Sequence, residues 1–541
     1  MDAKGEMEKI VSVSVGDQTS LPGVQALARA VREMYAEGQT DYSLDPIVLE
    51  SAAGEAIGRV KDGDAVIFCC RRGEREIQLT EAFTDPDLSQ FPREPFKVLP
   101  FVILTLYHDK FKDLPVAFAP SKVQDTLGEL VSRAGLSQAR ISESEKFAHV
   151  TFFFNGGNGQ PFLREKDIRV ASLKGVRFDD YPELSLAGVK QEVLGQIQKG
   201  TDLIITNFAN GDVIGHTANF DAKIKCVEYV DQHLGEIIDA ASAAGYVTLI
   251  TADHGNIEET FMDEGSPHVS HTTNPVSLSI IDPLSNKPVE PTPGKLADVA
   301  PTILGILGVL KSVLMTGKNL AQGHDFCRHR KVLLVILDGW GISQHPEQDP
   351  IAIGRTPTWD KLMYEHPHAL LAASGEAVGL KPGKAGNSEA GHINIGAGRV
   401  ILQDDVRLDN AMKDGSFYGN EVILNEIHGV LKRGSALHLI GLLTEKSSHG
   451  SIDYPLAVLK MARDAGLERV YLHMIFDGRS TEPGSAPVLL EKLESLMDEV
   501  GVGQIVTGIG RGIALDRDGN YYKTQRAYDA LVRGIGRRIQ A

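Results

Sequence analysis

Cysteine is scarce in this chain. Its 541 residues include four cysteines, and no pair of them has the Cys-x-x-Cys spacing of metal and redox motifs. This absence excludes a site built on that motif. So few thiols in so long a chain are typical of a reducing compartment, and we therefore expect a cytoplasmic protein.

Long apolar runs are also missing. The longest of them, such as residues 98–107, are too short to cross a lipid bilayer. Residues 1–6 carry charges where a secretory signal peptide needs an apolar stretch. We therefore expect no membrane partner. Low-complexity tracts and tandem repeats are absent as well, which argues against a repeat architecture.

Basic residues are outnumbered by acidic ones. The sequence has 55 Lys and Arg against 72 Asp and Glu, which gives a formal net charge of −17 at pH 7. Such a surface repels a nucleic-acid backbone, so we expect no nucleic-acid partner. It repels a phosphorylated substrate equally, so a site for one must be locally basic. The length predicts two or more domains.

Short apolar and β-branched runs alternate with helical patterns along the chain. We expect strands at residues 64–68, 203–207, 247–251, 332–337, 437–443 and 470–476, and helices at residues 189–199, 222–244, 456–465 and 488–500. This alternation predicts an α/β fold with mostly parallel sheets flanked by helices. Ligands gather at the carboxyl ends of such strands, and Asp212, Asp253 and Asp338 stand at or just beyond an expected end.

Several polar motifs follow these apolar runs. They are Asn-Gly-Asp-Val-Ile-Gly-His at 210–216, Thr-Ala-Asp-His-Gly-Asn at 251–256, His-Val-Ser-His at 268–271, Leu-Asp-Gly at 337–339 and Gly-Asn-Ser-Glu-Ala-Gly-His at 386–392. Each motif alone is compatible with a turn or a helix cap. Together they offer carboxylates, imidazoles and a serine, a set that suits two divalent metal ions beside a serine nucleophile. Carboxylate and neutral imidazole ligands favour Mn2+, Zn2+ or Co2+ over Ca2+.

These motifs resemble those of the cofactor-independent phosphoglycerate mutase family, part of the alkaline phosphatase superfamily, over residues from about 15 to 541. In that family the Asp-Gly strand stands near the amino terminus, whereas here Asp253 precedes Asp338. The order therefore resembles a circular permutation. The resemblance implies an alkaline phosphatase-like metal-binding domain at 120–402. It also implies a phosphotransferase-like domain made of 403–541, its first part, and 1–119, its second part.

The resemblance also implies a reaction and the residues of a metal site. One ion would be held by Asp212, His216 and His271, and the other by Asp338, Asp253, His254 and Ser388. Mn2+ is the expected metal, with Co2+, Zn2+ and Mg2+ as alternatives, and no bisphosphoglycerate is required. Ser388 would take the phosphoryl group from 3-phosphoglycerate and return it as 2-phosphoglycerate, in glycolysis and gluconeogenesis. We expect this small-molecule enzyme to act as a monomer.

Basic side chains would hold the substrate. By resemblance, the residues that bind substrate or phosphate are Arg72, Arg75, Lys146, Arg479, Arg511 and Arg517. Arginine suits this role because its planar group donates two parallel hydrogen bonds to a carboxylate or phosphate. His449 is the residue expected to help transfer the proton.

The chain departs from the family pattern near these basic residues. Ser480 stands where the family has an acidic residue after Asp-Gly-Arg, and Glu482 is a candidate replacement. The stretch 444–448 and the pair Cys69-Cys70 also differ from the family. A second hypothesis is therefore a metal-dependent phosphatase or phosphomutase acting on another small phosphorylated substrate. A third, a non-catalytic binding protein, fits poorly with the full set of ligand-type residues.

Overall fold

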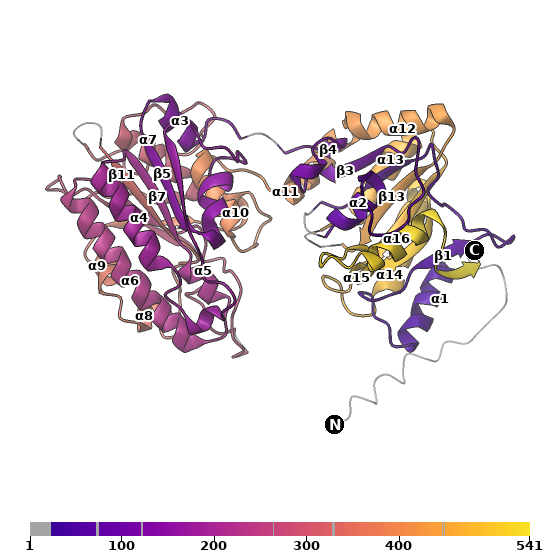
Figure 1. Ribbon diagram of the computed structural model, residues 1–541, viewed down its shortest axis with the longest axis horizontal. Coiled ribbons are helices and arrows are strands. Elements are labelled where there is room, and N and C mark those ends of the chain that lie inside the picture. Colours follow the sequence, from indigo (N-terminus) through magenta and orange to yellow (C-terminus); the bar gives the residue numbers. More distant parts are fainter. Residues whose placement is uncertain are drawn as a thin grey trace, which may run out of the picture. The chain divides into compact units, whose positions relative to one another are not determined.

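The computed structural model describes residues 23–71, 75–120, 123–262, 264–326, 330–445, 447 and 449–540. The chain forms two compact units (Figure 1). One unit, here called the split unit, combines the residues up to Pro120 with those from Arg407 onward. The other, the continuous unit, spans Ser121–Val406. The predicted arrangement of two mostly parallel sheets flanked by helices is confirmed.

The split unit is built on an eight-stranded sheet with the order β16-β1-β15-β14-β13-β2-β3-β4. Its strands are β1 (Ile47–Glu50), β2 (Ala65–Phe68), β3 (Phe101–Thr105), β4 (Val116–Phe118), β13 (Leu437–Leu443), β14 (Val470–Phe476), β15 (Gln504–Gly510) and β16 (Arg537–Gln540). Neighbouring strands are parallel except β1 and β15. Its helices are α1 (Gly23–Ala36), α2 (Ile77–Thr84), α12 (Glu421–Arg433), α13 (Asp453–Asp464), α14 (Ala486–Val500), α15 (Arg511–Ala514) and α16 (Tyr521–Val532), together with α11 (Asp404–Asp414) from Arg407 onward.

The continuous unit has a second eight-stranded sheet with the order β10-β12-β9-β8-β11-β7-β5-β6. Its strands are β5 (Gln138–Glu143), β6 (Glu165–Val170), β7 (Leu203–Phe208), β8 (Val247–Thr251), β9 (Val276–Ile281), β10 (Gly294–Lys295), β11 (Val332–Leu337) and β12 (His368–Ala372). Only the pairs that involve β9 are antiparallel among these described strands. Its helices are α3 (Leu127–Arg133), α4 (Leu186–Lys199), α5 (Asn210–Gly215), α6 (Phe220–Ala243), α7 (Val299–Leu307), α8 (Pro350–Ile353), α9 (Pro357–Tyr364) and α10 (Ser388–Ala397).

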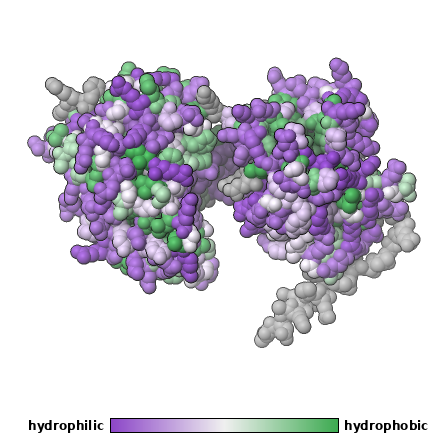
Figure 2. Space-filling model, in the orientation of Figure 1, coloured by the Kyte–Doolittle hydropathy of each residue, from purple (hydrophilic) through white to green (hydrophobic). Residues whose placement is uncertain are grey.

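The central strands are buried along their whole length, as the continuous apolar runs predict. Every residue of β11 is buried, and β11 lies between β7 and β8, parallel to both. Helices pack against the sheet (Figure 1), so both faces of a strand such as β11 meet apolar side chains. Hydrophilic residues dominate the surface seen in Figure 2, with small apolar areas between them.

All four predicted helices begin two or three residues earlier than the sequence predicts, and in two of them a proline accounts for the difference. The predicted starts at residues 456 and 488 follow a proline, whereas α13 begins at Asp453 and α14 at Ala486. Pro455 and Pro487 therefore lie in the first helical turn. A proline is tolerated there because the N–H that it lacks has no partner within the helix. Among the described residues, no helix combines the length and apolar character needed to cross a bilayer.

A buried chain of hydrogen bonds crosses the sheet of the split unit. His438 Nε2 donates to Asp64 Oδ2 (3.1 Å), and His438 Nδ1 lies 3.0 Å from His473 Nε2. His473 Nδ1 lies 2.9 Å from Thr507 Oγ1. Burial, followed by the nearby His438, holds the pKa of His473 well below its usual value, so the folded protein keeps this ring neutral.

The depressed pKa of His473 predicts acid sensitivity of the split unit. Below pH about 6.5 the unfolded chain binds a proton at this ring that the folded chain excludes. The contribution of this ring to the free energy of unfolding is therefore complete above that pH. It falls by about 1.4 kcal/mol per pH unit below it. Hydrogen exchange of β13 and β14 amides at pH 7.5 and 5.5, corrected for intrinsic rates, measures the loss. His473→Gln should reduce the pH dependence and the exposed control His428→Gln should not; equal slopes in all three proteins would contradict the prediction.

Candidate active site

Three aspartates meet at one end of the continuous unit. Asp338 directly follows β11, Asp253 follows β8, and Asp212 lies in α5, the short helix after β7. Because β7, β11 and β8 are adjacent and parallel, their carboxyl ends share one edge of the sheet. All three side chains are buried, with relative exposures of 6% or less. This edge is the one that the sequence predicts.

Ser388 is the first residue of α10, which places it at a helix amino terminus. The Asn387 side chain caps this helix by accepting a hydrogen bond from the Ala390 N–H (2.9 Å). Close backbone approach needs glycine on both sides of the serine. A Cβ at Gly386 would lie 2.2 Å from a backbone oxygen, and one at Gly391 would lie 2.6 Å from the Asp253 carbonyl oxygen. The motif thereby sets α10 directly against the aspartate edge.

The first predicted group of metal ligands lies together. The Nε2 atoms of His216 and His271 lie 3.3 Å and 3.1 Å from Asp212 Oδ1. The other ring nitrogen of each histidine donates to a backbone carbonyl, Val269 O at 2.9 Å and Gly386 O at 2.8 Å. These bonds leave Nε2 as the atom of each ring that faces the carboxylate, an arrangement common to histidines that bind metals. The three side chains form a candidate metal-binding group.

The second predicted group is more deeply buried. His254 Nε2 lies 3.5 Å from Asp338 Oδ1, 3.6 Å from Asp253 Oδ2 and 3.0 Å from Ser388 Oγ. His254 and both aspartates are fully buried. Asp253 Oδ2 accepts no hydrogen bond from the described residues, although Asp253 is buried. A buried carboxylate oxygen with spare acceptor capacity is what a divalent cation would satisfy.

Lys146 lies at the centre of the site. Its Nζ donates to Asp212 Oδ2 (2.6 Å), Asp338 Oδ1 (2.7 Å) and Ser388 Oγ (2.6 Å). The sequence predicts that Lys146 binds substrate. The structure places its Nζ between the two groups of predicted metal ligands, where it is also hydrogen-bonded to the Ser388 hydroxyl. It reaches this position from the turn Ser144–Lys146, which follows β5, the strand beside β7.

The electrostatics of this edge favour cations. Burial disfavours the charged form of Lys146, but the carboxylates of Asp338, Asp212 and Asp253 outweigh it and raise the pKa of the lysine. The same competition between burial and the aspartates raises the pKa of His254 to about 9. Burial raises the pKa values of Asp212 and Asp338, but Lys146 and the nearby histidines together outweigh it, so both pKa values are lowered. Concentrated negative charge and oxygen and imidazole donors fit divalent metal ions.

Two further residues that the sequence did not single out complete this site. His392 is fully buried, and its Nδ1 lies 2.8 Å from the Ser388 carbonyl oxygen and 3.2 Å from Asp253 Oδ2. Asn207 Nδ2 donates to Asp338 Oδ2 (2.6 Å) and lies 3.0 Å from His392 Nε2. The sequence pointed to His392 only through its position four residues after Ser388, which places both residues on the same face of a helix. Asn207 is a polar residue within an apolar strand.

Glu258 ties together the loops that carry the predicted ligands. Its buried carboxylate accepts hydrogen bonds from the N–H groups of Asn256 (2.7 Å) and Gly341 (3.1 Å). It also accepts from the hydroxyl of Thr272 (2.5 Å). These donors stand close in sequence to His254, to Asp338 and to His271. A single buried carboxylate thus links three chain segments, each of which carries a predicted metal ligand.

Predicted substrate residues of the split unit gather at the carboxyl ends of its strands. Arg511 directly follows β15, is buried and forms an ion pair with Asp477, which follows β14. Arg75, also buried, donates to the Leu515 carbonyl oxygen (3.2 Å). His449 lies beyond the end of β13 and contacts Glu76. The structure thus brings these side chains, which are distant in sequence, to one edge of the sheet.

The remaining predicted basic residues are placed differently. Arg479 and Arg517 also follow β14 and β15 but have exposed side chains. Arg72 lies outside the described residues, as do Lys446 and Ser448 of the stretch that departs from the family pattern. The roles of these arginines in binding substrate stay predictions.

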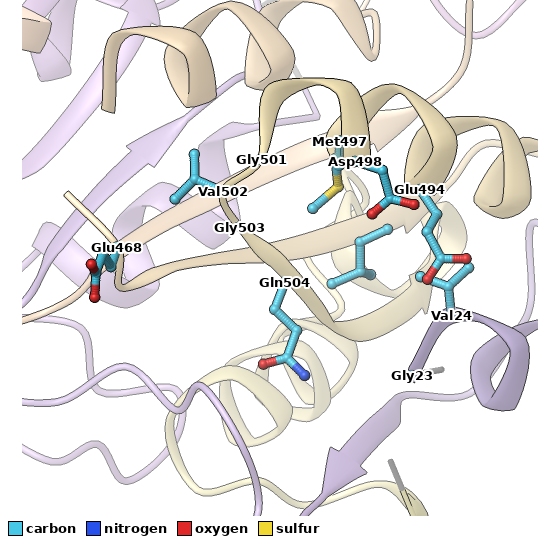
Figure 3. Close-up of a pocket in the computed structure, with 11 residues that line it drawn as sticks. Gly23, Val24, Glu468, Glu494, Met497, Asp498, Gly501, Val502, Gly503 and Gln504 are labelled. Atoms are coloured by element: carbon cyan, nitrogen blue, oxygen red, sulfur yellow. The ribbon is translucent and has the colours of Figure 1, made fainter. Parts of the chain in front are cut away.

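A cavity of about 540 Å³ opens elsewhere in the split unit (Figure 3). It is lined by Glu468, Glu494, Asp498 and Gln504, together with apolar and glycine residues. Gln504 begins β15, so this cavity lies at the amino ends of the strands, opposite to the edge that carries Arg511. Its three carboxylates would repel a phosphorylated molecule. The predicted substrate residues do not line it.

Comparison with known families agrees with the metal chemistry of this site. The model of the Metalloenzyme superfamily matches residues 11–311, more than half of the chain, and the chain belongs to this superfamily. A second model, described as the BPG-independent PGAM N-terminus, matches residues 408–541.

Two of the relatives that the chain resembles carry the same enzyme name. A 2,3-bisphosphoglycerate-independent phosphoglycerate mutase of Syntrophotalea carbinolica is 43% identical over 301 residues, 55% of this chain and 58% of the relative. A second such mutase, from Methanosarcina acetivorans, is 44% identical over 293 residues, 54% of this chain and 56% of the relative. The chain thus spans little more than half the length of these relatives. The solved structure of Leishmania mexicana phosphoglycerate mutase at low cobalt concentration has 28% identity and a TM-score of 0.39, and covers 50% of this chain and 53% of that chain.

The geometry predicts that Mn2+ binding depends on Asp212 and on pH. Asp212→Asn removes charge from the first ligand group, so we expect at least a tenfold weaker apparent affinity, roughly the lower end of losses seen at metal sites. Lowering the pH should also weaken binding, because protons compete for the imidazole and carboxylate ligands. Titration of the chelator-treated protein with Mn2+, followed by electron paramagnetic resonance, measures both effects. Asp239→Asn, on the exposed side of α6, is the matched control; a loss of the same size there would refute the assignment.

Proposed function

We propose that this protein interconverts 3-phosphoglycerate and 2-phosphoglycerate without bisphosphoglycerate, by way of a phosphoserine at Ser388. The observation that carries the proposal is the position of Ser388 Oγ, 2.6 Å from Lys146 Nζ and 3.0 Å from His254 Nε2, at the edge where the three aspartates meet. The names of the relatives and the match to the PGAM N-terminus model support the same activity.

The residues around Ser388 suit a phosphoryl acceptor. Asp212, His216 and His271 would hold one divalent ion, and Asp338, Asp253, His254 and Ser388 the other, with Mn2+ as the proposed metal. When bound, such ions supply positive charge that activates the serine hydroxyl and neutralises phosphoryl oxygens. Lys146 orients the hydroxyl through its hydrogen bond and adds a fixed positive charge beside it. The amino terminus of α10 directs backbone N–H groups and a partial positive charge toward the same position.

The split unit would hold the glycerate part of the substrate. Arg511 and Arg75 are fixed in place by Asp477 and by the Leu515 carbonyl oxygen. Arginines with restrained side chains lose little entropy when they bind a carboxylate or phosphate. We assign substrate binding to these two residues together with Arg72, Arg479 and Arg517. His449 is assigned to proton transfer.

A second candidate function is hydrolysis of a small phosphorylated molecule. The observation that favours it is the environment of Ser480, which is exposed and whose hydroxyl lies 3.3 Å from that of Ser447. A hydroxyl holds a glycerate less firmly than the family's carboxylate would. Water could then compete for the phosphoserine. Comparing 2-phosphoglycerate with inorganic phosphate among the products separates the two functions.

We also infer that the chain is a circularly permuted member of this family. The PGAM N-terminus model matches residues 408–541, after the match at 11–311. In the split unit the described ends lie side by side. Ile539 of β16 pairs with Leu49 of β1, and a Cβ at Gly23, which begins α1, would lie 3.0 Å from the Leu49 side chain. This arrangement supports the predicted division into an alkaline phosphatase-like domain at 120–402 and a phosphotransferase-like domain made of 403–541 and 1–119, which is close to the division into two compact units.

Ser388→Ala should abolish the proposed reaction. The substitution removes the oxygen that accepts the phosphoryl group, so conversion of 3-phosphoglycerate with Mn2+ and no bisphosphoglycerate should fall to background. Phosphate release should fall equally. Mass spectrometry of a quenched reaction should find phosphate on Ser388 in the unsubstituted protein. Ser242→Ala, in the last turn of α6, is the control; phosphate on a histidine, or full activity of Ser388→Ala, would exclude this mechanism.

A rearranged gene tests the inferred permutation. A chain that begins at Arg330, joins residue 540 to Gly23 through a short Gly-Ser linker and ends at Phe326 should fold and bind Mn2+ as the original does, because it keeps the buried residues Met315, Leu320 and Phe326. We expect this because the new connection joins neighbouring segments. Thermal unfolding and Mn2+ titration provide the measurement. The control opens the chain inside β11, a central strand, and should not fold; failure of the first design with linkers of several lengths would count against the inference.

A further inference from the structure

The segment that carries His449 is attached to the end of β2. Cys70 forms a β-bridge with Gly450, and the Arg71 N–H donates to the His449 carbonyl oxygen (3.0 Å). The Arg71 guanidinium also donates to the Ser447 carbonyl oxygen (2.7 Å). These contacts place the His449 side chain beside the start of α2, where Glu76 is the N-cap residue. Both the backbone and an arginine side chain therefore hold the histidine segment in this position.

His449 Nδ1 lies 3.1 Å from Glu76 Oε1. The Glu76 side chain is fully buried, and that of His449 is 14% exposed. Because a carboxylate oxygen accepts, Nδ1 must carry the proton of this hydrogen bond. In a neutral imidazole the lone pair then lies on Nε2, which becomes the basic atom of the ring. The contact therefore selects one tautomer of His449.

The environment of Glu76 connects the pair to a predicted substrate-binding arginine. Burial raises the pKa of Glu76, and the hydrogen bond from His449 is the largest opposing influence. The guanidinium of Arg511 also acts on this carboxyl group and lowers its pKa. Glu76 therefore lies within electrostatic reach of a predicted substrate-binding arginine. It follows Arg75, another such residue, directly in the chain.

The acidic candidates near Asp477 are placed differently from Glu76. Ser480 replaces the family's acidic residue, and its hydroxyl lies 3.3 Å from the hydroxyl of Ser447. Glu482, two residues further on, has an exposed side chain. Glu76 combines complete burial with a direct hydrogen bond to the histidine.

We propose that Glu76 is the positioning residue of His449, holding the ring in the Nδ1–H tautomer so that Nε2 exchanges a proton with a glycerate hydroxyl. This proposal rests on the proposed mutase function. The protonated ring gives its Nε2 proton to the substrate oxygen that loses the phosphoryl group to Ser388, and the neutral ring then takes a proton at Nε2 from the other hydroxyl as that oxygen receives the group. Nδ1 keeps its proton throughout. Glu76 holds the neutral ring in the Nδ1–H tautomer between the two transfers and stabilises the imidazolium that exists before the first and after the second, as carboxylates do in other acid–base pairs.

Glu76→Gln and Asp64→Asn form a matched pair of variants. Each replaces a buried carboxylate that is hydrogen-bonded to a histidine of the split unit, but Asp64 contacts His438, within the sheet. In Glu76→Gln the amide can donate to Nδ1, so we expect the 15N signals of His449 to shift from the Nδ1–H toward the Nε2–H form. His449→Gln assigns those signals. For 3-phosphoglycerate we expect kcat to fall at least tenfold with little change in KM, since acid–base catalysis usually contributes about 100- to 10,000-fold.

The outcomes separate this proposal from the function on which it rests. Unchanged 15N signals and kcat in Glu76→Gln, or an equal loss of kcat in Asp64→Asn, would overturn the role of Glu76. If the unsubstituted protein does not convert 3-phosphoglycerate, the proposed function fails, and the 15N signals still decide whether Glu76 sets the tautomer. Glu76→Asp, which keeps the carboxylate, should retain the Nδ1–H form and recover part of kcat. A folded Glu76→Asp protein that lacks the Nδ1–H form and recovers no kcat would also contradict the proposal.

Discussion

The ion pairs of Lys146 are the interaction on which the site depends. Three buried aspartates share one edge of the continuous unit, and carboxylates so close together repel one another strongly in a medium of low polarity. Lys146 Nζ lies within 2.7 Å of oxygens from two of them and of Ser388 Oγ. The lysine therefore joins the ends of β7 and β11 to the start of α10. Divalent ions bound there would reinforce the same balance of charge.

The two units have the same architecture, but the side chains at the carboxyl ends of their strands carry opposite charges. In each, functional side chains follow parallel strands and meet at their carboxyl ends. The continuous unit gathers carboxylates and imidazoles, which attract cations. The split unit gathers Arg75 and Arg511, which attract anions, and both are buried and hydrogen-bonded. This division shows how a chain with a net charge of −17 can still gather buried arginines at one edge of a sheet, as the proposed phosphorylated substrate requires.

Much of the fold could be predicted because buried parallel strands are continuous apolar runs. The bounds of β8, β11, β13 and β14 agree with the predicted ranges. Nearly all of their residues are buried, so the apolar runs mark these strands even where a histidine interrupts them, as at His438 and His473. The starts of α13 and α14 were predicted too late, because a proline that ends a helix elsewhere is accepted in a first turn.

The sequence by itself determined the fold class, the kinds of ligand and the nucleophile candidate, because these depend on local motifs and on hydrophobic pattern. Only the tertiary structure decided which side chains meet. Lys146 contacts partners 66, 192 and 242 residues away, and His449 lies 373 residues from Glu76. No local pattern records such pairs, because strand order within a sheet, not spacing along the chain, brings them together. His392 and Asn207 became visible as partners of Asp253 and Asp338 for the same reason.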